Sequence, residues 1–321
     1  MAKVLLTGST GFVGAAVLAT LKDLPEIQVV ATIRKARAEI DSNTIVVGDI
    51  DGDTDFSAAL TGTDIVIHCA ARAHIMYDDV ADPMTEYRRV NVAGTLNLAR
   101  QAARCGVRRF IFISSIKVNG ESTTSKPKFN ACDMPVPLDA YGQSKAEAEK
   151  ALLELSRETN MEVVIIRPPL VYGPAVKANF ASLFSIVARG IPLPFACICN
   201  NKRSLVSVTN LVDLIVTCIE HPKAENQIFL VSDDHDVSTS EMVREMAVAL
   251  GKPTWQIPVP VWIYELAGKL FSKSDIVDRL TGSLQVDITH TKETLNWIPK
   301  ETIQEGFKKT AVAFLQSKNS R

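Results

Sequence analysis

The chain has 321 residues, of which 46% are hydrophobic and 22% are charged, and its formal net charge is −1. This balance excludes a global basic field that recruits nucleic acid or anionic lipid, so we expect neither a nucleic-acid partner nor membrane insertion. The six cysteines form no CxxC pair and no paired His/Cys spacing. We therefore expect no metal site and a cytoplasmic location. The first predicted strand begins at residue 3, so we expect no signal peptide.

Strands and helices alternate through the first half of the chain. Runs rich in Val and Ile predict buried strands, and runs rich in Ala and Leu predict the helices between them. The expected strands are 3–7, 27–33, 44–47, 64–69, 109–113 and 162–167, and the expected helices are 12–24, 83–104 and 141–159. This alternation predicts an α/β fold of the Rossmann type, with a doubly wound parallel sheet covered on both faces.

The alternation loosens after Pro168-Pro169. We expect a dinucleotide-binding domain over 1–167 and a smaller mixed α/β substrate-binding lobe over 168–321, partly interleaved with the sheet. The strongly apolar stretch 255–271 could be a helix that touches a membrane, but at this length we expect a packed cover. The expected elements of this half are helices 178–189, 210–220, 238–250 and 303–316 and strands 206–208 and 227–231.

Three glycines follow the first strand at a spacing of three: Gly8, Gly11 and Gly14. A glycine turn between a strand and a helix presents backbone N–H groups and a helix N-terminus to a pyrophosphate, which predicts a dinucleotide site. The alternative is an ordinary tight turn without a ligand.

Tyr141 and Lys145 are four residues apart, so on a helix they share a face one turn apart. A tyrosine with an ordinary pKa near ~10 needs a neighbouring cation to stabilise its phenolate before it can transfer protons at neutral pH. Ser115, at the carboxyl end of the fifth strand, is the candidate hydroxyl beside it. An isolated pair of this kind also occurs on ordinary amphipathic helices, but here it follows the glycine turn and the strand that ends in serine.

Together these features resemble the extended short-chain dehydrogenase/reductases, in the branch of nucleotide-sugar epimerases and reductases, over essentially the whole chain. The matching segments are Gly8–Gly14 for TGxxGxxG, Asp49-Ile50, Ala70-Ala71, Asn91–Thr95 for NVxGT, Arg167–Pro174 for RxxxVYGP, and Asp287–Trp297 for the closing D…LGW, with Asn296 in place of Gly.

The resemblance implies a catalytic triad of Ser115, Tyr141 and Lys145, in which Tyr141 transfers the proton and Lys145 lowers the tyrosine pKa. It also implies a homodimer through helices 83–104 and 141–159. The implied substrate-binding residues are Ser115, Tyr141, Asn179 and Arg203. The implied cofactor-binding residues are Gly8, Thr10, Gly11, Phe12, Val13, Gly14, Arg34, Asp49, Ile50, Ala70, Ala71, Asn91, Tyr141 and Lys145.

Two departures from the family pattern bear on the reaction. The Asp-Glu pair of the 4,6-dehydratases is replaced by Ile116 and Lys117, which excludes that elimination. The second strand ends at Arg34 rather than an acid, which favours NADP(H) over NAD(H), because an arginine pairs with a 2′-phosphate.

The reaction that we expect first is reduction of UDP-2-acetamido-2,6-dideoxy-4-hexulose at C4 to UDP-N-acetylquinovosamine, for O-antigen lipopolysaccharide biosynthesis. The alternative is a UDP-glucose or UDP-N-acetylglucosamine 4-epimerase with tightly held NAD. A dinucleotide sensor without activity is the competing class, and the presence of both Tyr141 and Lys145 speaks against it. We expect His68 to be a satisfied core residue and His74 to line the substrate cleft.

Overall fold

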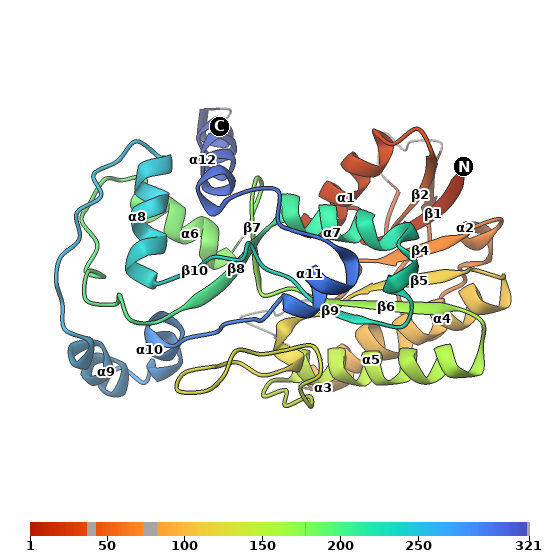
Figure 1. Cartoon of the computed structure of the whole chain (residues 1–321), viewed down its shortest axis with the longest axis horizontal. Helices are drawn as coiled ribbons and strands as arrows, with labels where there is room; N and C mark the ends of the chain where they lie inside the picture. Colours follow the sequence, from red (N-terminus) through yellow and green to blue (C-terminus); the bar gives the residue numbers. More distant parts are fainter. Residues whose placement is uncertain (37–42, 73–81, 177, 320–321) are drawn as a thin grey trace.

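A computed structural model describes residues 1–36, 43–72, 82–176 and 178–319 (Figure 1). A larger lobe built on a central sheet lies beside a smaller lobe along the longest axis of the molecule. The strands are β1 (Ala2–Thr7), β2 (Ile27–Ile33), β3 (Thr44–Val46), β4 (Ile65–His68), β5 (Arg109–Ile113), β6 (Glu162–Arg167), β7 (Leu170–Tyr172), β8 (Arg203–Ser207), β9 (Ile228–Leu230) and β10 (Asp236–Val237). The helices are α1 (Phe12–Lys22), α2 (Ser57–Leu60), α3 (Pro83–Tyr87), α4 (Thr95–Arg104), α5 (Ala140–Glu158), α6 (Ala178–Val187), α7 (Val208–Glu220), α8 (Thr239–Ala249), α9 (Val261–Leu270), α10 (Ser274–Thr281), α11 (Thr289–Leu295) and α12 (Ile303–Asn319).

Seven parallel strands form the central sheet in the order β3-β2-β1-β4-β5-β6-β9. The chain winds outward from β1 in one direction and then returns to wind outward from β4 in the other. This confirms the predicted Rossmann-type, doubly wound fold, and it places a crevice at the carboxyl ends of β1 and β4. The last strand, β9, comes from the second half of the chain and pairs with β6.

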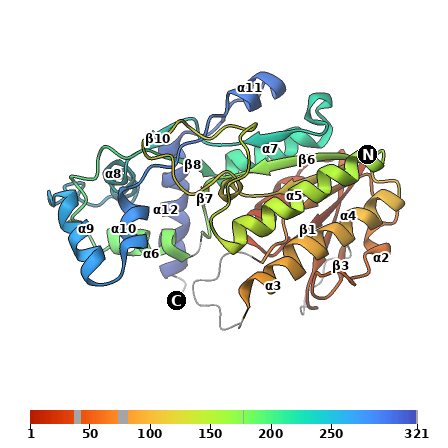
Figure 2. The ribbon, with the colours of Figure 1, turned by 90° about the horizontal axis from the view of Figure 1, so that it is seen from below.

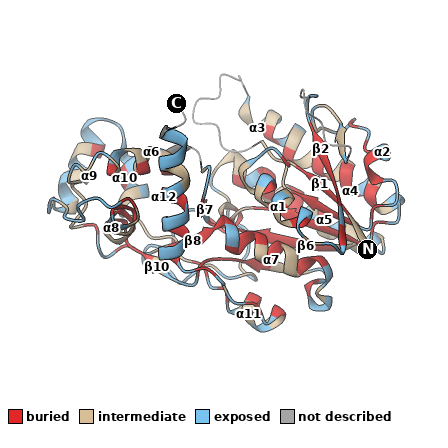
Figure 3. Cartoon of the chain, turned by 90° about the horizontal axis from the view of Figure 1, so that it is seen from above, coloured by how far each residue is buried: buried red, intermediate tan, exposed pale blue. Residues whose placement is uncertain are grey.

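Alternate residues of the strands face the two helical layers. Val4 and Leu6 of β1 belong to the core shared with α1 and α7, whereas Leu5 belongs to the core shared with α4 and α5. Figure 2 shows α4 and α5 in front of the sheet, and Figure 3, from the opposite side, shows α1 and α7 over strands that are almost wholly buried. Burial on both faces explains why these strands are continuous apolar runs rather than alternating ones.

The smaller lobe contains a short sheet in the order β10-β8-β7. Its core is an aromatic cluster in which the Tyr172 and Phe307 ring centroids are 4.8 Å apart and Phe180 and Phe184 are 5.5 Å apart. These residues come from β7, α6 and α12, so the cluster joins elements that are far apart in sequence.

The predicted helix 83–104 is divided into α3, a π-helical stretch over Arg88–Gly94, and α4. Single wide turns of this kind are frequent at functional sites. Asn91 lies in this stretch and is buried, so the wide turn coincides with one of the predicted cofactor residues.

The stretch 255–271, expected to be a packed cover, is packed on one side and exposed on the other. Helix α9 presents Trp262, Leu266 and Leu270 to solvent, because its packed side is made mainly of Tyr264, Ala267 and Gly268. In the described part of the chain, no helix is long and apolar enough to cross a membrane.

Candidate active site

The turn between β1 and α1 has the geometry that a dinucleotide phosphate requires. Gly8 has φ +72°, and a Cβ there would lie 2.6 Å from the backbone nitrogen of Ala70, so only glycine fits. Gly11 is the N-cap of α1 and has no side chain to occupy the helix N-terminus. Free backbone N–H groups therefore face the crevice at the carboxyl ends of β1 and β4.

A cavity opens directly in front of this turn. It is enclosed by the ends of β1 and β2, the 47–50 loop, and the segment that follows β4. Predicted cofactor residues that line it are Gly8, Thr10, Gly11, Arg34, Asp49, Ile50, Ala70 and Ala71. Phe12, Val13 and Gly14 instead form the first turn of α1 behind the cavity.

The rim of the cavity carries opposed charges. Arg34 Nε lies 3.0 Å from Asp49 Oδ1, and both side chains are largely exposed. Thr32, at the end of β2, has a buried hydroxyl without a hydrogen-bond partner among the described residues. The lining of the cavity thus includes the Arg34 cation, the Asp49 carboxylate and the unsatisfied Thr32 hydroxyl.

Tyr141 lies in the first turn of α5, close to the turn that follows β5. Asp139 caps this helix by accepting a hydrogen bond from the Gly142 N–H at 2.7 Å. A Cβ on Gly142 would lie 2.8 Å from the Lys117 carbonyl oxygen, so glycine is what lets the helix approach this turn. This close approach brings Ser115 near enough to Tyr141 to influence the pKa of the phenol.

The environment of Tyr141 raises its pKa above the ordinary value. Burial is the largest cause, the charge of Asp139 and the neighbouring Tyr87 add to it, and the hydrogen bond with Ser115 acts in the opposite direction. Desolvation of the phenolate outweighs the stabilising groups around it. Lys145 is not among the causes of this shift, so the expected lowering of the Tyr141 pKa by Lys145 stays a prediction.

Lys145 lies on the same face of α5, one turn further on. Its ammonium donates to the Ile113 carbonyl oxygen at 2.8 Å and lies 4.3 Å from the centre of the Phe112 ring. Burial lowers its pKa to about 8, against the opposing charges of Glu149 and Cys69. Cys69, whose charge influences the pKa of Lys145, also lines the cavity, so Lys145 lies near the predicted cofactor site.

A buried ionic network attaches α5 to the central sheet. Arg167 Nη2 and Glu149 Oε2 are 2.5 Å apart, and both side chains are almost completely buried. Ser114 donates a hydrogen bond to Glu149, and Arg167 Nη1 donates to Asn119 at 2.9 Å. These contacts fix α5 to the ends of β5 and β6, the strands that precede Ser115 and the smaller lobe.

Asn91 and His68 have structural partners. Asn91 accepts from the Arg72 N–H at 2.8 Å and donates to Ser144 at 3.0 Å, so it joins the segment after β4 to α5. His68 bonds Thr7 at 2.7 Å and Thr95 at 3.0 Å. Burial, followed by the charge of Lys145, lowers the pKa of His68 to about 3, as expected for a satisfied, neutral core histidine.

The predicted substrate residues are not gathered at this cavity. Arg203 lies on β8, where it donates to the carbonyl oxygen of Arg279 at the end of α10. Burial, and then the charge of Arg279, lower the Arg203 pKa. His74 and the side chain of Asn179 lie outside the described residues.

Sequence reasoning missed two groups of residues. Arg72 and Arg89 line the cavity, but no motif marks them. Glu149 could have been found, because it follows Lys145 by four residues on the face that also carries Tyr141. Among the described residues, no group of three or more His, Cys, Asp or Glu side chains could hold a metal ion.

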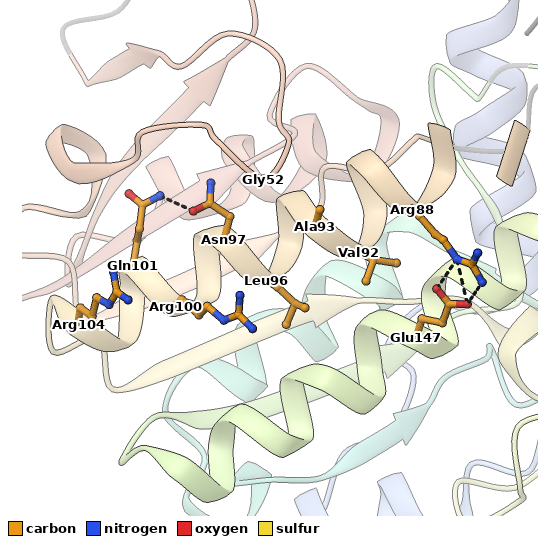
Figure 4. Close-up of a pocket in the computed structure, with 10 residues that line it drawn as sticks. All are labelled: Gly52, Arg88, Val92, Ala93, Leu96, Asn97, Arg100, Gln101, Arg104 and Glu147. Atoms are coloured by element: carbon orange, nitrogen blue, oxygen red, sulfur yellow. Dashed lines mark hydrogen bonds and ion pairs between the residues drawn. The ribbon is translucent and has the colours of Figure 1, made fainter. Parts of the chain in front are cut away.

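A second depression lies on the outer surface of α4 and α5 (Figure 4). Arg88 reaches across to Glu147 of α5, with Nη2 and Oε1 2.7 Å apart. Half-buried Val92, Ala93 and Leu96 lie along its floor. This surface lies on the helices that were predicted to form a dimer.

The fold and the glycine turn define a Rossmann-type protein with a dinucleotide-shaped crevice, and comparisons with known proteins agree. Residues 4–232 match the NAD dependent epimerase/dehydratase family. A UDP-glucose 4-epimerase of Vibrio cholerae is 63% identical over 316 residues, which are 98% of this chain and 96% of that protein.

Solved structures agree at the level of the fold. A UDP-glucuronic acid 4-epimerase from Bacillus cereus in complex with NAD superimposes with a TM-score of 0.78 at 20% identity, over 98% of this chain and 99% of that one. A UDP-N-acetylglucosamine 4-epimerase from the same organism gives 0.80 at 17% identity, over 98% and 100%. The chain therefore belongs to the NAD dependent epimerase/dehydratase family, and the predicted resemblance to this branch of the extended short-chain dehydrogenase/reductases is confirmed.

Proposed function

We propose that this enzyme is a UDP-sugar 4-epimerase that holds its nicotinamide dinucleotide through the catalytic cycle. The observation that carries the proposal is the 63% identity to a UDP-glucose 4-epimerase over nearly the whole of both chains. This identity favours the alternative of the sequence analysis over the 4-ketoreductase that we expected first. A role in O-antigen biosynthesis stays a prediction.

The residues present fit a bound dinucleotide. The narrow Gly8 turn leaves room for a pyrophosphate, and the unsatisfied Thr32 hydroxyl has hydrogen-bonding capacity that a ribose could use. Asp49 and Ile50 would flank the adenine, and Ala70 and Ala71 would lie under the ribose and diphosphate. A bound oxidised nicotinamide would supply a hydride acceptor for C4 of the sugar and, once reduced, a hydride donor for the same carbon.

The predicted triad would then transfer the proton of the sugar C4 hydroxyl. Tyr141 would take the proton from the C4 oxygen of the sugar during oxidation and would return it to that oxygen during reduction. Ser115, which lies near the phenol, would hold the C4 oxygen. Lys145 keeps an ammonium beneath this site, and the charge of Glu149 supports its protonation.

This chain has no acid–base pair at the position where the 4,6-dehydratases carry Asp and Glu. Ile116 is buried, and the Lys117 ammonium is paired with Asp139 and with Glu121, the latter at 3.0 Å. Neither residue can remove a proton from C5 while protonating a leaving hydroxyl.

We propose NAD as the resident cofactor, although the sequence favoured NADP(H). The earlier argument rests on Arg34 as a partner for a 2′-phosphate. In the structure Arg34 pairs with Asp49 at 3.0 Å, so its charge is already matched and a carboxylate stands beside it. That carboxylate would repel a 2′-phosphate.

A homodimer through the α3–α4 and α5 face belongs to the same proposal. Half-buried small and apolar side chains there, Val92, Ala93 and Leu96, suit close packing of helices against a second copy.

The test is to incubate the purified protein with UDP-glucose and, separately, with UDP-N-acetylglucosamine, and to separate the sugars by chromatography. We expect gluco and galacto forms to interconvert without net change at the nicotinamide absorbance band. Stoichiometric oxidation of added NADPH or NADH by the 4-keto-6-deoxy sugar, with no interconversion, would overturn the proposal in favour of the 4-ketoreductase.

A further inference from the structure

Lys117, in the turn that follows β5, contacts the segments that carry two members of the predicted triad. Its backbone N–H donates a hydrogen bond to Ser115 Oγ at 3.2 Å. Its ammonium pairs with the carboxylate of Asp139, the N-cap of α5, two residues before Tyr141. One residue therefore links the strand end that carries the serine to the helix that carries the tyrosine.

The backbone contact orients the Ser115 hydroxyl. A serine oxygen that accepts a hydrogen bond from an N–H group keeps its own hydrogen for donation to another oxygen. Ser115 is the N-cap of the short helical turn Ile116–Val118, so the contact is part of the local structure of this turn. The hydroxyl can thus donate to a sugar oxygen, as the proposed function requires.

The Asp139 carboxylate is shared between α5 and Lys117. Its Oδ1 accepts from the Gly142 N–H at 2.7 Å, and its Oδ2 faces the Lys117 ammonium. The two backbones also touch directly, because a Cβ on Gly142 would lie 2.8 Å from the Lys117 carbonyl oxygen. Backbone packing and an ion pair therefore fix the start of α5 against the turn after β5.

This ion pair differs from an ordinary surface pair. The Lys117 and Asp139 side chains are only 28% and 26% exposed, whereas those of Lys150 and Glu154, further along α5, are 79% and 55% exposed. Burial acts to lower the pKa of Lys117, but its bonds to Asp139 and Glu121 and their charges outweigh that effect and raise the pKa. The ammonium is therefore charged at neutral pH.

The pair also bears on the charge beside the phenol of Tyr141. Burial is the largest cause of the raised Tyr141 pKa, the negative charge of Asp139 is the second, and Tyr87 of α3 is the third. A cation paired with the Asp139 carboxylate reduces the net charge that the phenolate meets. Lys117 is thus placed to act on Tyr141 through Asp139.

We propose that Lys117 is a positioning residue for the reaction, which holds the Asp139 cap, and with it the first turn of α5, where Tyr141 and Ser115 can act on one sugar oxygen. The proposal deepens the proposed function and rests on it. It assigns Lys117 no contact with the sugar. At a position where the 4,6-dehydratases carry an acid, this chain carries a cation that orders the helix of the tyrosine.

The first test separates positioning from substrate binding. Lys117→Met keeps a side chain of similar length without the charge, and we expect kcat for UDP-glucose interconversion to fall by about tenfold because the reacting groups lose their alignment. KM should stay within about twofold of wild type. Lys117→Arg keeps the charge and should restore most of the lost rate. The matched control is Lys150→Met on the exposed side of α5, which should behave as wild type.

The second test asks whether Lys117 acts through Asp139. Asp139→Asn keeps an oxygen that can accept from the Gly142 N–H, but it removes the charge that Lys117 meets. In that background Lys117→Met should change kcat by less than about twofold, because coupled residues are not additive. An equal loss in both backgrounds would contradict the proposal.

A third readout does not involve the sugar. Amide hydrogen exchange over 140–144 should be faster in Lys117→Met than in wild type, and unchanged in Lys117→Arg and Lys150→Met. Unchanged exchange in Lys117→Met, a change in KM alone, or failure of Lys117→Arg to restore the rate would overturn the positioning role. Absence of sugar interconversion by wild-type protein would instead contradict the proposed function, so the two failures are distinguishable.

Discussion

Helices α5 and α9 depart in opposite directions from the usual placement of charged and apolar side chains. Helix α5 buries Lys145 and Glu149, whereas α9 exposes Trp262, Leu266 and Leu270. In α5 each buried charge has polar partners, so the burial creates a fixed electrostatic site. The exposed side chains of α9 are apolar, so they need no polar partners. They leave an apolar surface that another molecule could cover. The comparison teaches that charges are buried in this molecule where polar partners meet them, and that an apolar face is exposed where no described element packs on it.

The largest effect is expected from the reacting end of α5. Tyr141→Phe removes the only group that we assign to proton transfer, so sugar interconversion should slow by ~10²–10⁴-fold. The measurement is the single-turnover rate with UDP-glucose, with Tyr87→Phe as the neighbouring aromatic control, because the two rings are 6.1 Å apart. Turnover of Tyr141→Phe within a few-fold of wild type would remove Tyr141 from the mechanism.

The free energy of unfolding should depend strongly on the buried ion pair between Glu149 of α5 and Arg167. Glu149→Gln leaves the Arg167 charge without its carboxylate, which should cost about 3–5 kcal/mol in the free energy of unfolding. Denaturant unfolding measures this, and Glu154→Gln, on the exposed side of the same helix, should change little. A loss of stability no larger than in the control would show that the network contributes little.

The same substitution should also change the pH dependence of activity. Lys145 is protonated below its pKa of about 8 and loses its charge above it, so activity should fall as pH rises through about 8. The Glu149 carboxylate raises the pKa of Lys145, so Glu149→Gln should move the falling limb to lower pH. A pH profile of kcat that keeps its upper limb in place would assign that limb to another group.

One added charge should disrupt the proposed dimer contact on α4 and α5. Leu96→Arg places a long cation on the floor of the α4–α5 depression (Figure 4) and should convert the proposed dimer to a monomer. Light scattering reports the mass. Leu138→Arg, exposed elsewhere on the same lobe, is the control. An unchanged mass for both variants would place the dimer contact, if wild type is dimeric, on another face.

The smallest effect is expected at the exposed Arg34–Asp49 pair. If NAD is the cofactor, Arg34→Ala should change NADH affinity by no more than about fivefold, because exposed pairs contribute ~0–1 kcal/mol. Fluorescence titration with NADH and NADPH measures both affinities. Tighter binding of NADPH by wild type, lost in the variant, would restore the NADP(H) assignment.

The amino-acid sequence by itself determined the sheet, the glycine turn and the order of the predicted catalytic residues. These features depend on local patterns: apolar runs for β1 to β6, glycines where the backbone must turn, and the four-residue spacing of Tyr141 and Lys145. A one-dimensional pattern is enough for them, because neighbours in the chain set the strand, the turn and the helix face.

Only the tertiary structure decided which distant groups meet. The Glu149–Arg167 pair joins α5 to β6, the Arg34–Asp49 pair joins the ends of two loops, and the phenol of Tyr141 has a raised pKa because several elements enclose it. The outward face of α9 was likewise decided by packing, since an apolar run does not state which of its sides finds a partner. The reason is the same in each case: burial and charge pairing depend on contacts between segments whose separation in sequence carries no signal of their distance in space.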